Sequence, residues 1–305
     1  MSLFCVKALL DPGKSPFALA RRARRLPNIW VATPVLVMVF VIGFSFALIP
    51  TAIALGDMEA TETLVDGPYG LVVPFALVVG ALAVWVRLYE RRPFATVGFG
   101  REKAAAKCLV GFLFGFLMLA ASVALMALVG GVTVEVGGSQ PHGVTAIGSS
   151  LVLLLCFVVQ AGAEETAVRG WYLQVLGARY KPWIAVVVTS AVFMLMHVPA
   201  QPIAILNLLL FGLFTAVYCL HEDSIWGVCG WHTAWNWAMM NFFGLRVSGQ
   251  EPMGGSLFDL QATGSSLLSG GDYGPEASLC ATLVFVTAIL AVVMFTPKRE
   301  PVSPE

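Results

Sequence analysis

Residues 182–220, with the sequence PWIAVVVTSAVFMLMHVPAQPIAILNLLLFGLFTAVYCL, form a stretch of 39 residues without Asp, Glu, Lys or Arg. As a single helix this stretch would be about 58 Å long, whereas about 20 apolar residues already cross a hydrocarbon core about 30 Å thick. The VPAQP segment at residues 198–202 contains two prolines, which disfavour a continuous helix. The stretch therefore predicts two consecutive membrane-spanning helices joined by a short turn.

The composition of the whole chain has the same apolar character. Of the 305 residues, 58% are hydrophobic and only 12% are charged, about half the charged fraction of soluble globular proteins. The 18 basic and 18 acidic residues leave no cationic surplus that would indicate nucleic acid as a partner. Because the six cysteines form no CxxC pair, we interpret them as reduced packing residues. The composition predicts an integral, multi-pass membrane protein in contact with the lipid bilayer.

Further apolar runs of spanning length predict an all-α, polytopic transmembrane bundle of about eight helices. The predicted helices lie at residues 29–50, 69–87, 105–132, 146–176, 182–199, 203–220, 224–245 and 277–296. Gly111 and Gly115 form a GxxxG pair in the third of these, where we expect close packing against another helix of the same chain.

The charged residues predict how the bundle is oriented. Lys and Arg in short loops favour the cytoplasmic side, and eight crossings place most of them on the same side as both termini. We therefore expect both termini in the cytoplasm and the chain in the bacterial cytoplasmic (inner) membrane. The basic residues of this side are Lys7, Lys14, Arg21, Arg22, Arg24, Arg25, Arg87, Arg91, Arg92, Arg101, Lys103, Lys107, Arg179, Lys181, Lys298 and Arg299. The opposite side receives Arg246 and the acidic residues Asp57, Glu59, Glu62, Asp66, Glu251, Asp259, Asp272 and Glu276.

Ionisable residues interrupt three of the predicted helices. An ionisable group near the centre of a span costs about 2.5–3.5 kcal/mol on insertion scales, so such groups are rare and usually functional. Glu164 and His197 lie at equal depth, each about 20 Å from the turn that joins their helices. His232 and Asn236 lie roughly 12 and 18 Å from the same side. We predict that these four side chains share one water-containing cavity.

Helical phase separates the roles of two adjacent glutamates. Glu165 and Arg169 are four residues apart, about 40° around the helix, so we expect them to form an ion pair. Glu164 is about 140° from Arg169 and is therefore assigned to the cavity. Phe193 lies one turn before His197, where it can pack against the imidazole ring or the cavity wall.

Three motifs follow one another on separate hydrophobic helices. They are EExxxR (Glu164, Glu165, Arg169), FxxxH (Phe193, His197) and HxxxN (His232, Asn236). This order resembles the CAAX protease and bacteriocin-processing family of intramembrane endopeptidases, which includes the type II CAAX prenyl endopeptidases. The resemblance covers roughly residues 146–245, a third of the chain, and all three motifs are complete.

The resemblance implies a membrane-embedded peptidase. In that case Glu164 is the general base that activates water, and His197 holds this water and assists proton transfer. His232 and Asn236 then donate hydrogen bonds to the oxyanion of the tetrahedral intermediate. The implied partner is a membrane-associated peptide or protein substrate, and whether that substrate is prenylated stays open.

Two alternatives remain beside this interpretation. Glu164, His197 and His232 could supply three ligands to a catalytic zinc ion, although the chain has no HExxH motif and we favour a mechanism without a cofactor. The chain could instead be a non-enzymatic transporter or partner-binding regulator whose buried charges form a structural network.

These predictions divide the chain into five parts. Residues 1–28 form a basic cytoplasmic arm, and residues 29–145 form the N-terminal transmembrane helices and loops. Residues 146–245 form the helical core that carries the three motifs. Residues 246–276 are an outer loop rich in Gly and Ser, expected to be flexible, and residues 277–305 are the last helix with a short cytoplasmic tail.

Overall fold

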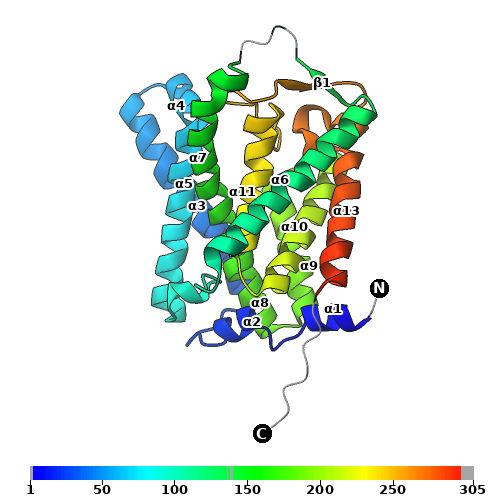
Figure 1. Cartoon of the computed structure of the whole chain (residues 1–305). Helices are drawn as coiled ribbons and strands as arrows, with labels where there is room; N and C mark the ends of the chain where they lie inside the picture. Colours follow the sequence, from blue (N-terminus) through cyan, green and yellow to red (C-terminus); the bar gives the residue numbers. More distant parts are fainter. Residues whose placement is uncertain (1–2, 136, 138–139, 297–305) are drawn as a thin grey trace.

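The computed structural model describes residues 3–135, 137 and 140–296, which form the helical bundle shown in Figure 1. The predicted all-α bundle is confirmed. Its main helices are α3 (Ile29–Leu55), α5 (Pro68–Trp85), α6 (Ala104–Leu128), α7 (Ile147–Glu165), α9 (Pro182–Met196), α10 (Pro202–Glu222), α11 (Trp226–Trp237) and α13 (Leu279–Met294). The break between α9 and α10 falls at the predicted VPAQP turn.

The longer of these helices fit a multi-pass membrane protein. Two apolar helices are shorter, with 15 residues in α9 and 16 in α13. The count of eight crossings and the cytoplasmic position of the termini stay predictions. In the described part of the chain, five helical segments are long and apolar enough to cross a membrane, namely Ile29–Leu55, Pro68–Glu90, Ala104–Leu128, Gly143–Arg179 and Pro202–Glu222.

Three of the helices continue into π-helical turns that the sequence pattern does not predict. These turns are η1 (Val86–Glu90) after α5, η4 (Thr166–Tyr172) between α7 and α8 (Leu173–Arg179), and η5 (Ala238–Phe242) after α11. A π turn closes hydrogen bonds over five residues instead of four, and such turns are frequent at functional sites. The turn η4 begins directly after Glu165, the second residue of the EExxxR motif.

Glycines bring α6 and α11 into backbone contact at the centre of the bundle. A Cβ atom at Gly111 would overlap the carbonyl oxygen of Gly227, and one at Gly115 would overlap that of Trp231. From the other side, a Cβ atom at Gly230 would overlap the carbonyl oxygen of Cys108. The expected GxxxG packing within the chain is therefore confirmed, and it buries the helix that carries His232 and Asn236.

The N-terminal arm covers one end of the bundle, at the bottom of Figure 1. It contains α1 (Leu3–Leu9) and α2 (Ser15–Ala20), and residues 1–2 lie outside the described part. Phe17 is fully buried against Gly177, where a Cβ atom would overlap its ring. Lys14 pairs with Asp223 at 3.3 Å. The arm therefore closes the end of the bundle where the basic residues gather.

Short elements build the opposite end, which carries α4 (Met58–Val65) and a two-stranded antiparallel sheet. In this sheet, Val132 of β1 (Val132–Val134) lies opposite Ala262 of β2 (Leu260–Ala262). The other short elements at this end are η3 (Gly143–Ala146), α12 (Ser266–Ser269), η6 (Gly271–Tyr273) and η7 (Pro275–Ala277), whereas η2 (Phe94–Thr96) packs against α2 at the end that the arm covers.

Residues 246–276 differ from the flexible loop that their composition suggested. They contain a strand and short helices, and side-chain hydrogen bonds hold the turns between them. Asn241, for example, donates to the carbonyl oxygens of Met253 and Gly255 at 2.8 and 3.0 Å. This loop therefore has a defined shape over the end of the bundle. The predicted tail at residues 297–305, with Lys298 and Arg299, lies outside the described residues.

Candidate active site

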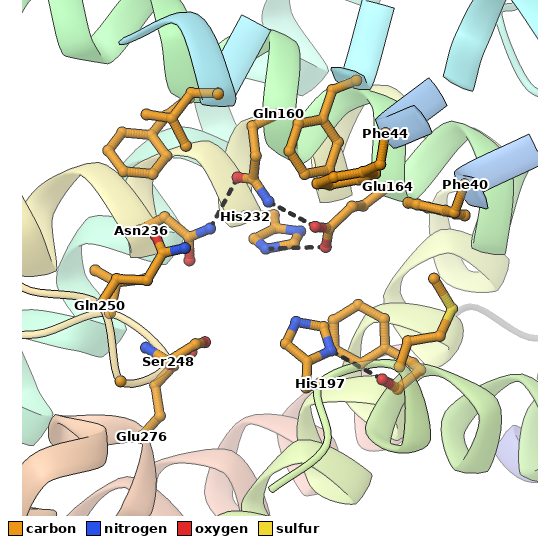
Figure 2. A pocket seen from close by; sticks show the side chains of 18 of the residues that line it. Phe40, Phe44, Gln160, Glu164, His197, His232, Asn236, Ser248, Gln250 and Glu276 are labelled. Atoms are coloured by element: carbon orange, nitrogen blue, oxygen red, sulfur yellow. Dashed lines mark hydrogen bonds and ion pairs between the residues drawn. The ribbon is translucent and has the colours of Figure 1, made fainter. Parts of the chain in front are cut away.

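Glu164 lies in the last turn of α7, and its two carboxylate oxygens have different surroundings. Gln160, one turn earlier on the same helix face, donates from Nε2 to Oε1 of Glu164 at 2.7 Å. Oε2 of Glu164 has no hydrogen-bond partner among the described residues, although the side chain is only 12% exposed. Oε1 is therefore fixed, whereas Oε2 accepts no hydrogen bond and has only the ion-pair contact with Nε2 of His232 at 4.0 Å (Figure 2).

Glu165 points the other way, into a fully buried ion pair. Its Oε1 accepts a hydrogen bond from Nη1 of Arg169 at 3.2 Å and another from Nδ1 of His232 at 2.9 Å. The guanidinium of Arg169 also lies 4.2 Å above the ring of Phe193. Glu165 thus joins α7 and η4 to α11, in the arrangement that helical phase predicts.

His197 follows the last residue of α9, where the turn before Pro199 ends the helix. Its Nδ1 lies 2.9 Å from the carbonyl oxygen of Phe193, which can only accept, so we assign the proton to Nδ1. The neutral ring then presents Nε2 as a hydrogen-bond acceptor. The Phe193 ring lies 4.5 Å from the imidazole and fixes its orientation.

His232 and Asn236 are buried on one face of α11, at 2% and 6% exposure. Since His232 donates from Nδ1 to Glu165, its Nε2 points toward Glu164 and lies 4.0 Å from Oε2. Asn236 donates from Nδ2 to Oε1 of Gln160 at 3.0 Å. The second hydrogen on Nδ2 of Asn236 remains for another acceptor.

A single cavity of about 930 Å³ connects these groups, as Figure 2 shows. Glu164, His197, His232 and Asn236 all line it, so the structure brings together the four predicted residues. One wall is apolar and consists of Val37, Phe40, Val41 and Phe44 of α3 and Leu71 and Phe75 of α5. The wall toward the acidic end consists of residues 247–253 and Glu276.

The buried charges around Glu164 come close to balance. Glu164, Glu165 and Arg169 together carry one net negative charge when both carboxylates are ionised. One additional proton, on His232 or on Glu164, makes the group neutral.

Sequence reasoning did not assign a role to three polar residues that the structure places on the cavity wall. Gln160 links Glu164 to Asn236, and its position four residues before Glu164 on the same helix face could have revealed it. Ser248 and Glu276 line the opposite wall and are bonded to each other at 2.8 Å. We expected Glu276 among the acids of the side opposite the basic residues, and no local pattern shows that this residue is buried.

A second buried ion pair lies near the basic end. Arg92 donates from Nε to Oε2 of Glu90 at 2.6 Å, and Trp171 donates to Oε1 at 2.5 Å. Trp85 donates to the same Oε1 at 3.3 Å. Both oxygens of Glu90 are therefore occupied, and the pair does not line the cavity.

The zinc alternative depends on how close Glu164, His197 and His232 lie to one another. Within the described residues, no three His, Cys, Asp or Glu side chains are grouped closely enough to hold a metal ion. Glu164 and His232 approach each other, but His197 does not complete a group of three with them. The residues as arranged do not fit a three-ligand zinc site, so we derive no chemical step through a metal.

Fold and site together define a polytopic membrane protein with a buried acid and histidine centre. Residues 146–238 match the family described as type II CAAX prenyl endopeptidase, Rce1-like. These 93 residues contain all three motifs, so the resemblance seen in the sequence is confirmed over this segment. No curated protein and no solved structure matches the chain. The family match supports a membrane-bound peptidase.

Proposed function

We propose that the protein is an intramembrane endopeptidase in which Glu164 activates a water molecule to hydrolyse a peptide bond. The observation that carries this proposal is Oε2 of Glu164, which accepts no hydrogen bond and lies 4.0 Å from Nε2 of His232, on a side chain that lines one cavity with His197, His232 and Asn236. A carboxylate on a cavity that two imidazoles and an amide also line is suited to general acid and base catalysis.

In the first step, Oε2 of Glu164 takes a proton from water while the water oxygen attacks the carbonyl carbon of the substrate. Nε2 of His197 accepts a hydrogen bond from the second O–H of this water and orients it. The tetrahedral intermediate then collapses, the bond from carbon to nitrogen breaks, and the departing amine takes the proton from Glu164. The products are one carboxylate terminus and one amine terminus.

His232 and Asn236 stabilise the negative charge on the substrate oxygen. Asn236 uses the Nδ2 hydrogen that Gln160 leaves free, and a protonated His232 donates from Nε2. Glu165 supports the protonated form because it accepts the hydrogen bond from Nδ1 at 2.9 Å. Donors fixed in place before the reaction are effective because they need no reorganisation in the transition state.

The proposed substrate is a membrane-associated peptide or protein segment. The cavity suits it because apolar residues of α3 and α5 form one wall, and the carboxylate, imidazole and amide groups lie among the rest of its lining. We further propose that the protein lies in the bacterial cytoplasmic membrane with both termini inside. The basic residues around the arm favour this orientation under the positive-inside rule.

The direct test compares wild type with Glu164→Ala in lipid vesicles that contain a membrane-tethered peptide library. We expect mass spectrometry to detect cleaved peptides for wild type only, while both proteins unfold at the same temperature. Membrane proteomics of cells that express either form would then identify natural substrates. Full activity in both Glu164→Ala and Glu165→Ala would overturn the assignment, and wild type without any product would favour a transporter or regulator.

The zinc alternative has its own test. Dialysis against a chelator, followed by measurement of metal content and activity in the same fraction, distinguishes the two mechanisms. We expect the metal-depleted protein to keep its activity. Loss of activity that zinc alone restores would instead assign Glu164, His197 and His232 as metal ligands.

A further inference from the structure

Glu276 is a buried acid on the cavity wall that the catalytic steps do not use. It is 4% exposed and lies in η7, at the acidic end of the bundle. Figure 2 shows it beside Ser248, across the open space from the side chains of Gln160 and Glu164. An acid at this position faces whatever occupies the cavity next to the reacting bond.

Both carboxylate oxygens of Glu276 are fixed by neutral donors. Oε1 accepts from Nε1 of Trp235 at 3.2 Å, and Oε2 accepts from the backbone N and the Oγ of Ser248 at 2.9 and 2.8 Å. Trp235 precedes Asn236 on α11, so Glu276 is tied to the helix that carries the oxyanion donors. These contacts orient the carboxylate without neutralising its charge.

The cavity supplies no cation of its own for Glu276. Among the described residues, neither Lys nor Arg lines the cavity, and no ion pair involves Glu276. Glu251 and Asp66 add acidic groups to the same wall, although Glu251 already pairs with Arg246. A buried carboxylate is stabilised strongly by a charged partner, so a cationic ligand gains more here than a neutral one.

We propose that Glu276 is the binding site for a cationic side chain, Lys or Arg, of the peptide segment that the protein cleaves. This inference rests on the proposed peptidase function and names the substrate class. The segment reaches the site from the acidic end, where the loop at residues 247–253 and the exposed Asp66 line the cavity. Its basic side chain pairs with Glu276 while its backbone carbonyl lies at Glu164.

The test uses the full chain in vesicles with membrane-tethered peptides in which one position at a time is Lys or norleucine. We expect wild type to prefer Lys at one position near the cleaved bond by about 10- to 100-fold in kcat/KM. In Glu276→Gln this preference should fall to near unity, and in Glu276→Asp it should partly remain. The exposed α4 variant Glu59→Gln is the matched control and should keep the wild-type preference.

The outcomes separate this inference from the proposed function. If Glu276 only holds the loop through Ser248, its variants will lower kcat/KM for Lys and norleucine peptides equally, which overturns the inference. Cleavage by wild type without a Lys preference at any position overturns it as well. If wild type cleaves nothing, the peptidase proposal fails, and photo-crosslinking to Glu164→Gln still tests binding. Equal crosslinking of Lys and norleucine peptides would then reject the cationic site.

Discussion

Within the described residues, two buried pairs of an acid and an arginine differ in what surrounds the acid. At the basic end, Glu90 has both oxygens occupied by Arg92, Trp171 and Trp85. In the middle of the bundle, the Glu165–Arg169 pair lies beside Glu164, whose Oε2 accepts no hydrogen bond and whose side chain lines a cavity. Burial and charge are common to both pairs, so they do not by themselves distinguish the candidate site. The distinguishing feature is a carboxylate oxygen without a hydrogen-bond partner on a side chain that lines a cavity.

The largest effect is expected from replacing Glu164, the acid whose Oε2 accepts no hydrogen bond. In Glu164→Gln the base is lost while the hydrogen bond from Gln160 keeps an acceptor, so we expect turnover to fall by about 10²- to 10⁴-fold. The temperature of unfolding should stay near that of wild type, because Oε2 of Glu164 bonds to no described residue. Peptide cleavage and thermal unfolding of the same preparation measure both quantities. A fall in stability together with turnover would make Glu164 structural.

At the basic end, we expect replacement of the buried acid to lower stability and to leave turnover unchanged. Glu90→Gln leaves Arg92 buried without its counter-charge, so the free energy of unfolding should fall by about 3–5 kcal/mol. Turnover per folded molecule should not change, since Glu90 does not line the cavity. Denaturant titration in detergent micelles measures the stability, with Glu59→Gln as the exposed control. Lost turnover at unchanged stability would contradict the structural role of Glu90.

The proposed oxyanion donor gives a third, smaller effect. In Asn236→Ala the donor from Nδ2 is gone, and we expect kcat to fall by about 10²- to 10³-fold with little change in KM. Steady-state kinetics with one membrane-tethered peptide measure the two constants separately. Wild-type turnover in this variant would show that Asn236 only packs between α11 and α7.

The smallest expected effect concerns Gln160, the residue that joins Glu164 to Asn236. Gln160→Leu removes two hydrogen bonds that position these side chains, and we expect kcat to fall about 10-fold. KM should stay close to that of wild type, because Gln160 is a positioning residue, while the unfolding temperature should fall because two buried polar groups lose their partner. If KM rose while kcat stayed constant, Gln160 would instead contact the substrate directly.

Much of the fold could be predicted because the apolar runs are long and prolines interrupt them. The VPAQP turn and the glycine contacts between α6 and α11 depend on local sequence and simple sterics. The π turns could not be predicted in this way, since an extra residue per turn has no distinct hydrophobic period. The turn η4 packs closely against a segment distant in the sequence, since a Cβ atom at Gly170 would lie 2.5 Å from the carbonyl oxygen of Val97.

The site residues likewise include some that the sequence predicts and one that it does not. Glu164, Glu165 and Arg169 lie on one helix, so their directions follow from helical phase. Glu276 lies far from the three motifs in the chain, and its burial depends on Trp235 and Ser248 from other elements. A single sequence contains no periodic signal for such contacts. This is why the charge distribution assigns Glu276 to the acidic side but does not reveal its position on the cavity wall.

The short helix α9 makes the thickness of the surrounding lipid relevant to the reaction. Its 15 residues extend about 22 Å, less than the roughly 30 Å of an average hydrocarbon layer. A bilayer becomes thinner beside a short helix at a modest energetic cost per ångström. For the proposed peptidase, water would therefore lie closer to His197 in membranes of short acyl chains than in membranes of long ones, and we expect the lipid composition of the host to affect its rate.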